Sequence, residues 1–145
     1  MTERSSGKNS IIPRVIRVLL IVLGALLVLG CLFTIFRIRI QANQSLRDAK
    51  NVYMALNAAQ IEFYSKGESI FDPSNYRGIS TGVDDIVSTL ADSNGEYRII
   101  SYDSKNHIIK EMIYQNNNYY ITFKFDNGRN DWTVRYLMPV YLIGE

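Results

Sequence analysis

Residues that most often carry chemistry are scarce in this sequence. It contains one histidine, His107, and one cysteine, Cys31. A single histidine cannot build a multi-histidine metal site, and a single cysteine cannot form a disulfide within the chain. The sequence also has no GxxxxGK[ST] phosphate-binding loop, no GxGxxG motif and no HExxH zinc motif. We therefore expect a protein that is not an enzyme, with no catalytic residue, no metal ligand and no cofactor site.

Two acidic groups could in principle do chemistry. Asp84 and Asp85 are adjacent, but the apolar spacing around them predicts a short helix capped by Thr81, in whose first turn carboxylates are stabilising. The segment DNGRND, residues 126–131, offers oxygen atoms for calcium but lacks the bidentate glutamate of an EF-hand loop. Because Asn-Gly between two alternating segments is typical of a hairpin turn, we interpret this segment as a turn.

The charge of the chain is divided unevenly along its length. The formal net charge is +2, but residues 1–40 hold six basic groups and one acidic group, whereas residues 41–145 hold ten basic and 13 acidic groups. Basic residues in the second part are scattered among acids and form no aromatic-basic platform. We therefore expect no nucleic-acid partner and interpret the N-terminal charge as a flank of a membrane segment.

An apolar segment from Val18 to Phe36 contains 19 residues without a charge. As a helix it would span roughly 29 Å, close to the roughly 30 Å hydrocarbon core of a bilayer. Its Leu, Ile, Val and Phe residues favour insertion by about 4 to 8 kcal/mol. The pattern predicts a transmembrane helix over residues 18–36 preceded by a basic tail over residues 1–17, with the lipid bilayer as its partner.

Two cleavable signals compete with this anchor. A secretory signal is disfavoured because the apolar segment is long and ends on Arg37 and Arg39 instead of a small-residue cleavage site. A lipoprotein signal would use the sequence VLGC, which ends at Cys31, but residues 32–36 stay apolar where a polar tether would normally begin. We expect an uncleaved anchor with Cys31 packed in the membrane helix.

The positive charges do not decide the orientation, because four Lys or Arg residues lie near each end of the span. The short N-terminal tail favours a cytoplasmic N-terminus. We therefore expect a single-pass protein of the cell membrane with an extracytoplasmic C-terminal domain.

The helical pattern continues past the membrane segment as an amphipathic helix over residues 37–66. Apolar residues recur there at spacings of three and four, and Gly67 supplies a stop. The stripe comprises Leu46, Ala49, Val52 or Tyr53, Leu56, Ala59 or Gln60, and Phe63. It covers too few heptads for a coiled coil and is rich in Ala and aromatic residues, so it is suited to be covered by a sheet.

Residues 67–145 predict a loop, a short helix and a sheet that form one domain with residues 37–66. The short helix has Val83, Ile86 or Val87, and Leu90 on one face. Four segments with a period of two predict antiparallel strands at residues 97–102, 107–114, 119–125 and 132–137, the last with Trp132, Val134 and Tyr136 facing inward. The fold class is α+β, with a long N-terminal helix packed on an antiparallel sheet of about four strands.

This order of parts resembles type IV pilins and the pseudopilins of type II secretion. The local match is RDAKNVYMALNAAQIEFYSKG, residues 47–67, followed by GVDDIVSTLAD, GEYRIISYDSKNHI and NNYYITFKFDNGRNDWTV, which are similar to segments of pilin-like proteins from Gram-positive anaerobes. The resemblance covers about residues 15–137. It implies a pilin-like fold, a structural or assembly role, and other pilin-like subunits as partners of the N-terminal helix.

The sequence departs from the prepilin processing pattern, which is usually GFTLIE. Gly7 is followed by Lys8, Asn9 and Ser10, and no acidic residue occurs between Glu3 and Asp48. The resemblance therefore implies a minor, accessory or merely anchored pilin-like protein. The rival hypothesis is an extracytoplasmic sensor or binding domain held by a signal anchor or by a lipid on Cys31.

Overall fold

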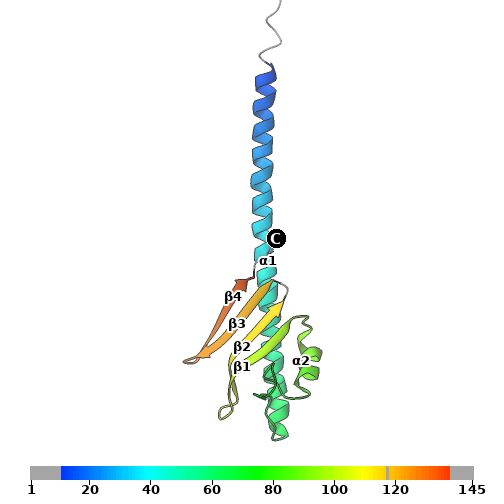
Figure 1. The fold of residues 1–145 in the computed structure, drawn as a ribbon, viewed down its shortest axis with the longest axis vertical. Helices are drawn as coiled ribbons and strands as arrows, with labels where there is room; N and C mark the ends of the chain where they lie inside the picture. Colours follow the sequence, from blue (N-terminus) through cyan, green and yellow to red (C-terminus); the bar gives the residue numbers. More distant parts are fainter. Residues whose placement is uncertain (1–10, 117, 138–145) are drawn as a thin grey trace, which may run out of the picture. The chain divides into compact units, whose positions relative to one another are not determined.

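The computed structural model describes residues 11–116 and 118–137, with side chains from Arg14 onward. Most of the expected basic tail, including Gly7, and the last eight residues of the expected C-terminal domain lie outside the described residues. The elements follow one another as α1 (Ile11–Ser65), α2 (Val83–Ala91), β1 (Glu96–Asp103), β2 (Ile108–Asn116), β3 (Tyr119–Asp126) and β4 (Arg129–Tyr136), as Figure 1 shows.

The chain divides into two compact units, residues 1–40 and residues 41–145. The first unit contains the N-terminal part of α1. That helix runs for 55 residues without interruption, because no proline follows Pro13 until Pro73. The second unit contains the rest of α1, helix α2 and all four strands.

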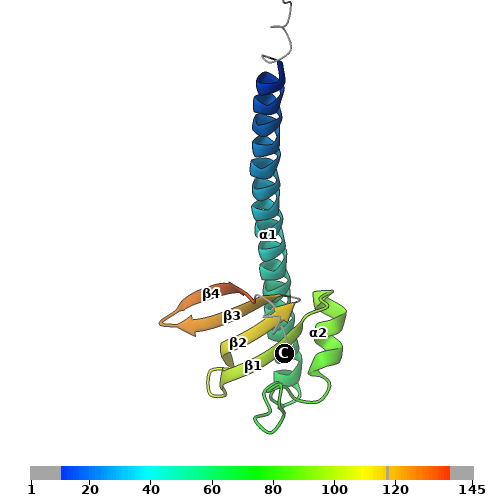
Figure 2. The ribbon, with the colours of Figure 1, turned by 45° about the horizontal axis from the view of Figure 1, so that its top comes forward.

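The second unit is a helix packed on a sheet, as Figures 1 and 2 show. The four strands lie in the order β1-β2-β3-β4, and each neighbouring pair is antiparallel. Residues of α1 beyond Gln41 cover one face of this sheet, while α2 lies beside α1 near β1. The α+β fold class expected from the sequence is confirmed.

The core lies between α1 and the sheet. From the helix come the predicted Ala49, Leu56 and Phe63, together with Val52, Ala55 and Ala59, all of which are buried. The strands contribute mostly alternate residues, because successive side chains of a strand point to opposite faces. The exception is β2, where Ile109 and Met112 are three residues apart at the point where the register with β1 shifts. These buried strand residues are Tyr97, Ile99, Ile109, Met112, Tyr114, Tyr119, Ile121 and Phe123.

The edge strand β4 is less buried than its pattern predicted. Trp132 and Val134 are partly buried against the core, but Tyr136 is 43% exposed. The reason is position, since β4 is the outermost strand beyond β3 and has a sheet neighbour on one side only. Its first residue is Arg129 instead of Trp132, because the turn is only Asn127 and Gly128, both with positive φ as a two-residue hairpin requires. The expected Asn-Gly hairpin turn is thus confirmed, but it is shorter than residues 126–131, because Asp126 ends β3 and residues 129–131 belong to β4.

Two predictions for the short helix α2 are wrong. Its N-cap is Gly82, with φ of 89° and no side-chain cap, so Thr81 does not cap it. Leu90 is 57% exposed, and the buried positions are Val83, Val87 and Ala91, spaced by four residues. Asp84 and Asp85 do lie in the first turn of the helix as expected.

Candidate functional site

The first candidate for a functional element is the N-terminal part of α1. It is one helix long and apolar enough to cross a membrane, with a mean hydropathy of 3.0 over its most apolar window, and that window is not buried by any described part of the protein. Its large apolar side chains between Val18 and Phe36 are 51–67% exposed. A core helix of a water-soluble protein would bury such residues, so this helix points to membrane anchoring.

The polar groups inside this apolar segment are compatible with a bilayer. Thr34 donates a hydrogen bond from its hydroxyl to the carbonyl oxygen of Gly30, at 2.9 Å, so its only polar side-chain group is satisfied within the helix. Cys31 is a free, exposed cysteine in the structure.

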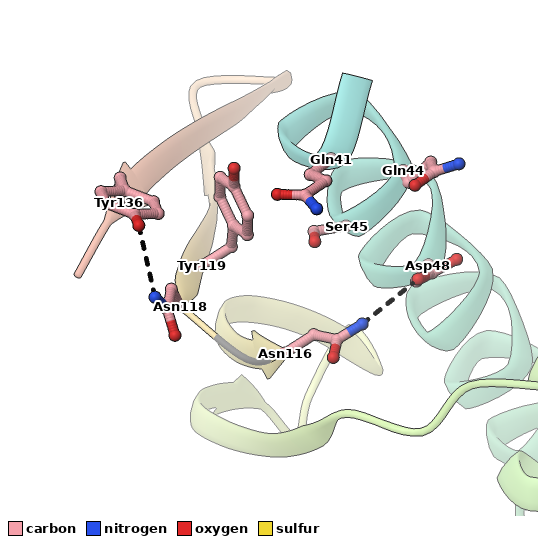
Figure 3. Close-up of a pocket in the computed structure, with 8 residues that line it drawn as sticks. All are labelled: Gln41, Gln44, Ser45, Asp48, Asn116, Asn118, Tyr119 and Tyr136. Carbon is pink, nitrogen blue, oxygen red and sulfur yellow. Dashed lines mark hydrogen bonds between the residues drawn. The ribbon is translucent and has the colours of Figure 1, made fainter. Parts of the chain in front are cut away.

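The second candidate site is a polar cavity of about 480 Å³ in the sheet unit, drawn in Figure 3. It lies between the first turns of the sheet-covered part of α1 and the ends of β2, β3 and β4. Every lining residue carries a hydrogen-bonding side chain: Gln41, Gln44, Ser45, Asp48, Asn116, Asn118, Tyr119 and Tyr136. No pattern in the sequence had indicated this site.

The helix side of the cavity is built by spacing along α1. Gln41, Ser45 and Asp48 are separated by four and three residues, so they share one face of the helix. Ser45 is buried, with only 5% of its surface exposed. Figure 3 shows Gln41 and Ser45 pointing from the helix toward Tyr119.

The strand side comes from the β2–β3 turn and from β4. Tyr119 and Tyr136 are register partners, and their rings meet edge to face with centroids 5.3 Å apart. The side chain of Asn118 donates a hydrogen bond from Nδ2 to the hydroxyl of Tyr136, at 3.3 Å. Its backbone carbonyl oxygen accepts a hydrogen bond from the backbone N–H of Leu137, at 2.6 Å. Asn118 therefore ties the end of β4 to the turn.

Asp48 is the only residue with a formal charge among the described residues that line the cavity. Nδ2 of Asn116 lies 3.5 Å from Oδ2 of Asp48, across 68 residues of sequence. Burial raises the pKa of Tyr119, and the nearby Tyr136 acts in the same direction, so the phenol of Tyr119 is held in its neutral form. The cavity thus presents neutral donors and acceptors beside one carboxylate, without a nucleophile and base in hydrogen-bond contact.

A second polar cluster joins the loop, α2 and β1. The guanidinium of Arg77 donates two hydrogen bonds to the carboxylate of Asp84, at 2.7 and 3.0 Å. Its Cζ lies over the ring of Tyr97, 4.6 Å from the ring centroid. The hydroxyl of Tyr97 donates to the same carboxylate at 2.6 Å. Hydrogen bonding from Arg77 lowers the pKa of Asp84, and burial raises that of Tyr97. These contacts cross three elements, so we assign the cluster a structural role as a clasp.

The remaining residues considered for chemistry have structural partners. His107 lies in the turn before β2, where Nδ1 is 3.4 Å from the hydroxyl of Tyr102 and the ring meets Tyr64 edge to face. Its carbonyl oxygen accepts a hydrogen bond from Nε2 of Gln60. Among the described residues, no group of three or more His, Cys, Asp or Glu side chains could hold a metal ion.

Comparisons with known proteins gave no relative for this chain. No protein family, no curated protein and no solved structure matches it. Its function must therefore be inferred from the apolar helix, the sheet unit and the polar cavity themselves.

Proposed function

We propose that this protein is a non-enzymatic, pilin-like structural or assembly protein held in the cell membrane by residues 18–36 of α1. The observation that carries the proposal is the unbroken helix, which passes from an exposed apolar segment into a segment covered by an antiparallel sheet. A simple anchor does not require the helix to continue into the folded domain. A subunit that assembles through its membrane helix does require it, because the same helix then holds the folded domain in the assembly.

Lateral packing in the bilayer would use the small residues of the span. In lipid, helices associate through close van der Waals contact, which small side chains permit. Gly24 and Cys31 are seven residues apart and therefore lie on the same face of the helix. Apart from Gly24 itself, its chain neighbours and the backbone of its own helix turn, no described atom lies within 4 Å of a Cβ added at Gly24, so that face is open to a neighbouring helix.

Cysteine crosslinking in membranes tests this packing. The native Cys31 is the only cysteine, so a Cys31→Ser background allows one new cysteine at a time between positions 24 and 31. We expect crosslinked species to recur every three or four residues, with strong crosslinking at Gly24→Cys and little at Leu26→Cys. Monomer at every position, with no pilin-type assembly component copurifying, would contradict the proposal.

The second candidate is an extracytoplasmic sensor or binding domain on a membrane anchor. The all-polar cavity favours it, because assembly through the helix needs no such site. The two candidates differ in what residues 18–36 must do. Replacing them with an unrelated apolar span should abolish assembly if the first is correct, but should leave ligand binding intact if the second is correct.

A further inference from the structure

The composition of the cavity between α1 and the β2–β3 turn is unusual for a small-molecule site. Such sites commonly measure about 300 to 1,000 Å³ and are lined mainly by apolar and aromatic side chains with a few polar groups. This cavity has a volume of about 480 Å³, within that range, yet all of the described side chains that line it carry hydrogen-bonding groups. The matching ligand must itself be rich in hydrogen-bonding groups.

The charge of the lining narrows the ligand class. None of the described lining residues is Lys, Arg or His, so among them a phosphate or carboxylate ligand would lack a cationic partner and would face Asp48. A calcium ion needs six to eight oxygen ligands and generally several carboxylates, whereas the described lining residues supply one carboxylate, that of Asp48. The lining therefore suits a neutral ligand.

The donor and acceptor types narrow it further. Side-chain amides such as those of Gln41 and Asn116 each donate and accept, as do the hydroxyls of Ser45 and Tyr119. A ligand with many hydroxyl groups, each of which also donates and accepts, can pair with such a surface at several points. Figure 3 shows these groups converging from the helix on one side and the strands on the other.

The contacts within the cavity leave room for such pairing. Asn116 to Asp48 and Asn118 to Tyr136 measure 3.5 and 3.3 Å, which is longer than the usual 2.9 to 3.0 Å of a hydrogen bond of this kind. Long contacts between neutral amides and their partners are readily exchanged for contacts to a ligand. Ser45, almost fully buried, places a hydroxyl on the helix side of the same space.

We propose that this cavity binds a neutral saccharide through the helix residues Gln41, Ser45 and Asp48 and the strand-side residues Asn116, Asn118 and Tyr119. The binding site lies wholly within the sheet unit and does not depend on assembly through the membrane helix. It would give the folded domain a glycan-binding activity whether or not the protein forms part of a pilus-like assembly.

Saturation-transfer NMR on the full chain in lipid nanodiscs tests the proposal. The probes are cellobiose, maltose and N,N′-diacetylchitobiose, with inorganic phosphate as the charged competitor. Nanodiscs replace glycoside detergents, whose sugar headgroups would occupy the site. We expect transfer to at least one saccharide and no displacement of it by phosphate.

Two alanine variants of the same helix, one inside and one outside the cavity, provide the matched comparison of saccharide affinity. Gln41→Ala removes an exposed lining amide, and Asn51→Ala removes an exposed amide of the same helix that lies outside the cavity. We expect Gln41→Ala to weaken saccharide binding about tenfold, Asp48→Asn to weaken it less, and Asn51→Ala to leave it unchanged, with equal circular dichroism for all three. Absence of transfer to every saccharide, equal binding by Gln41→Ala and Asn51→Ala, or displacement of the saccharide by phosphate would overturn the proposal.

Discussion

Two parts of the same helix solve opposite problems. Between Val18 and Phe36 the large apolar side chains of α1 are more than half exposed, whereas Leu56 and Ala59, further along the same helix, are completely buried under the sheet. Both parts have the backbone and the residues of a good helix. The comparison shows that the helix itself does not determine what covers its apolar surface: a sheet covers the second part, and we infer that lipid covers the first.

The polar side chains of α1 differ in the same way. In the first part Thr34 bonds to the backbone of its own helix. In the second part Gln60 donates to the carbonyl of His107, and Asp48 lies within reach of Asn116, so polar groups reach other elements. A bilayer offers no such partners, which is why a polar side chain there must be satisfied locally.

Equal substitutions in the sheet unit and in the apolar segment, residues 18–36, should have unequal effects on unfolding of the sheet unit. Phe123 is completely buried and meets the rings of Tyr53 and Trp132, whereas Phe33 is 64% exposed. We expect Phe123→Ala to lower the free energy of unfolding of the sheet unit by about 3 to 5 kcal/mol and Phe33→Ala to leave it unchanged. Urea titration of the full chain in nanodiscs, followed by circular dichroism, measures both. Equal losses would remove the distinction between the two parts.

Substitutions of glycine should show a smaller difference in the free energy of unfolding between the sheet unit and the apolar segment. Gly78 has φ of 67°, and a Cβ added there would overlap the carbonyl oxygen of Ile99 in β1. We expect Gly78→Ala to destabilise the sheet unit by about 1 to 3 kcal/mol. Gly30 has open space around it, so Gly30→Ala should leave the sheet unit unaffected and favour the helix. Urea midpoints of the two variants give the comparison, and a tolerant Gly78 would contradict the close approach of the loop to β1.

Breaking the clasp should cost less than either core change. Arg77→Ala removes the two hydrogen bonds to Asp84 and the contact with the Tyr97 ring. Because Asp84 is about half exposed, we expect the free energy of unfolding to fall by only about 1 kcal/mol. Arg77→Lys keeps the charge but loses the forked geometry, so its midpoint should lie between those of the wild type and Arg77→Ala. A lysine variant as unstable as the alanine variant would show that charge contributes nothing.

The clasp should also affect how the free energy of unfolding depends on pH in the acid range, and this is the smallest effect that we expect. The pKa of Asp84 is lowered from its usual 3.8, chiefly by hydrogen bonds from Arg77. Its contribution to stability is therefore present above pH 3.8 and is lost as the pH falls through the lower pKa of the folded state. We expect Asp84→Asn and Arg77→Ala each to make unfolding less steeply dependent on pH below 4. Asp72 and Asp103 also have lowered pKa values, so Asp72→Asn is the control that leaves the Arg77 contribution intact.

The elements with a periodic apolar pattern could be predicted from the sequence, whereas the polar sites, which have no such pattern, could not. The apolar stripe from Ala49 to Phe63 and the alternation of β3 identified the helix, the sheet and the face between them, because burial imposes spacings of 3.6 and two residues. The cavity joins Asp48 to Asn116, and the clasp joins Arg77 to Tyr97. Polar contacts between distant segments leave no repeat in the sequence, so neither site could be predicted from it.

The local errors have equally specific causes. Thr81 is a favourable cap by residue type, but the chain reaches α2 through Gly82 at positive φ, which the loop geometry requires. Tyr136 alternates correctly with Val134 yet stays partly exposed, because β4 is an edge strand. Pattern determines the side of the sheet on which a residue lies, and tertiary position determines how deeply it is buried.

Cysteine labelling tests most directly whether lipid covers the first part of α1. In the protein alone both Cys31 and Asn51 are exposed, so the structure without a bilayer gives no reason for different reactivity. In nanodiscs, which leave both membrane faces accessible, a water-soluble maleimide should label the Cys31→Ser, Asn51→Cys variant rapidly and leave Cys31 of the wild type unlabelled until SDS is added, with intact mass confirming that Cys31 carries no acyl group. Labelling of Cys31 as fast as that of position 51 before SDS is added would show that residues 18–36 do not lie in the bilayer.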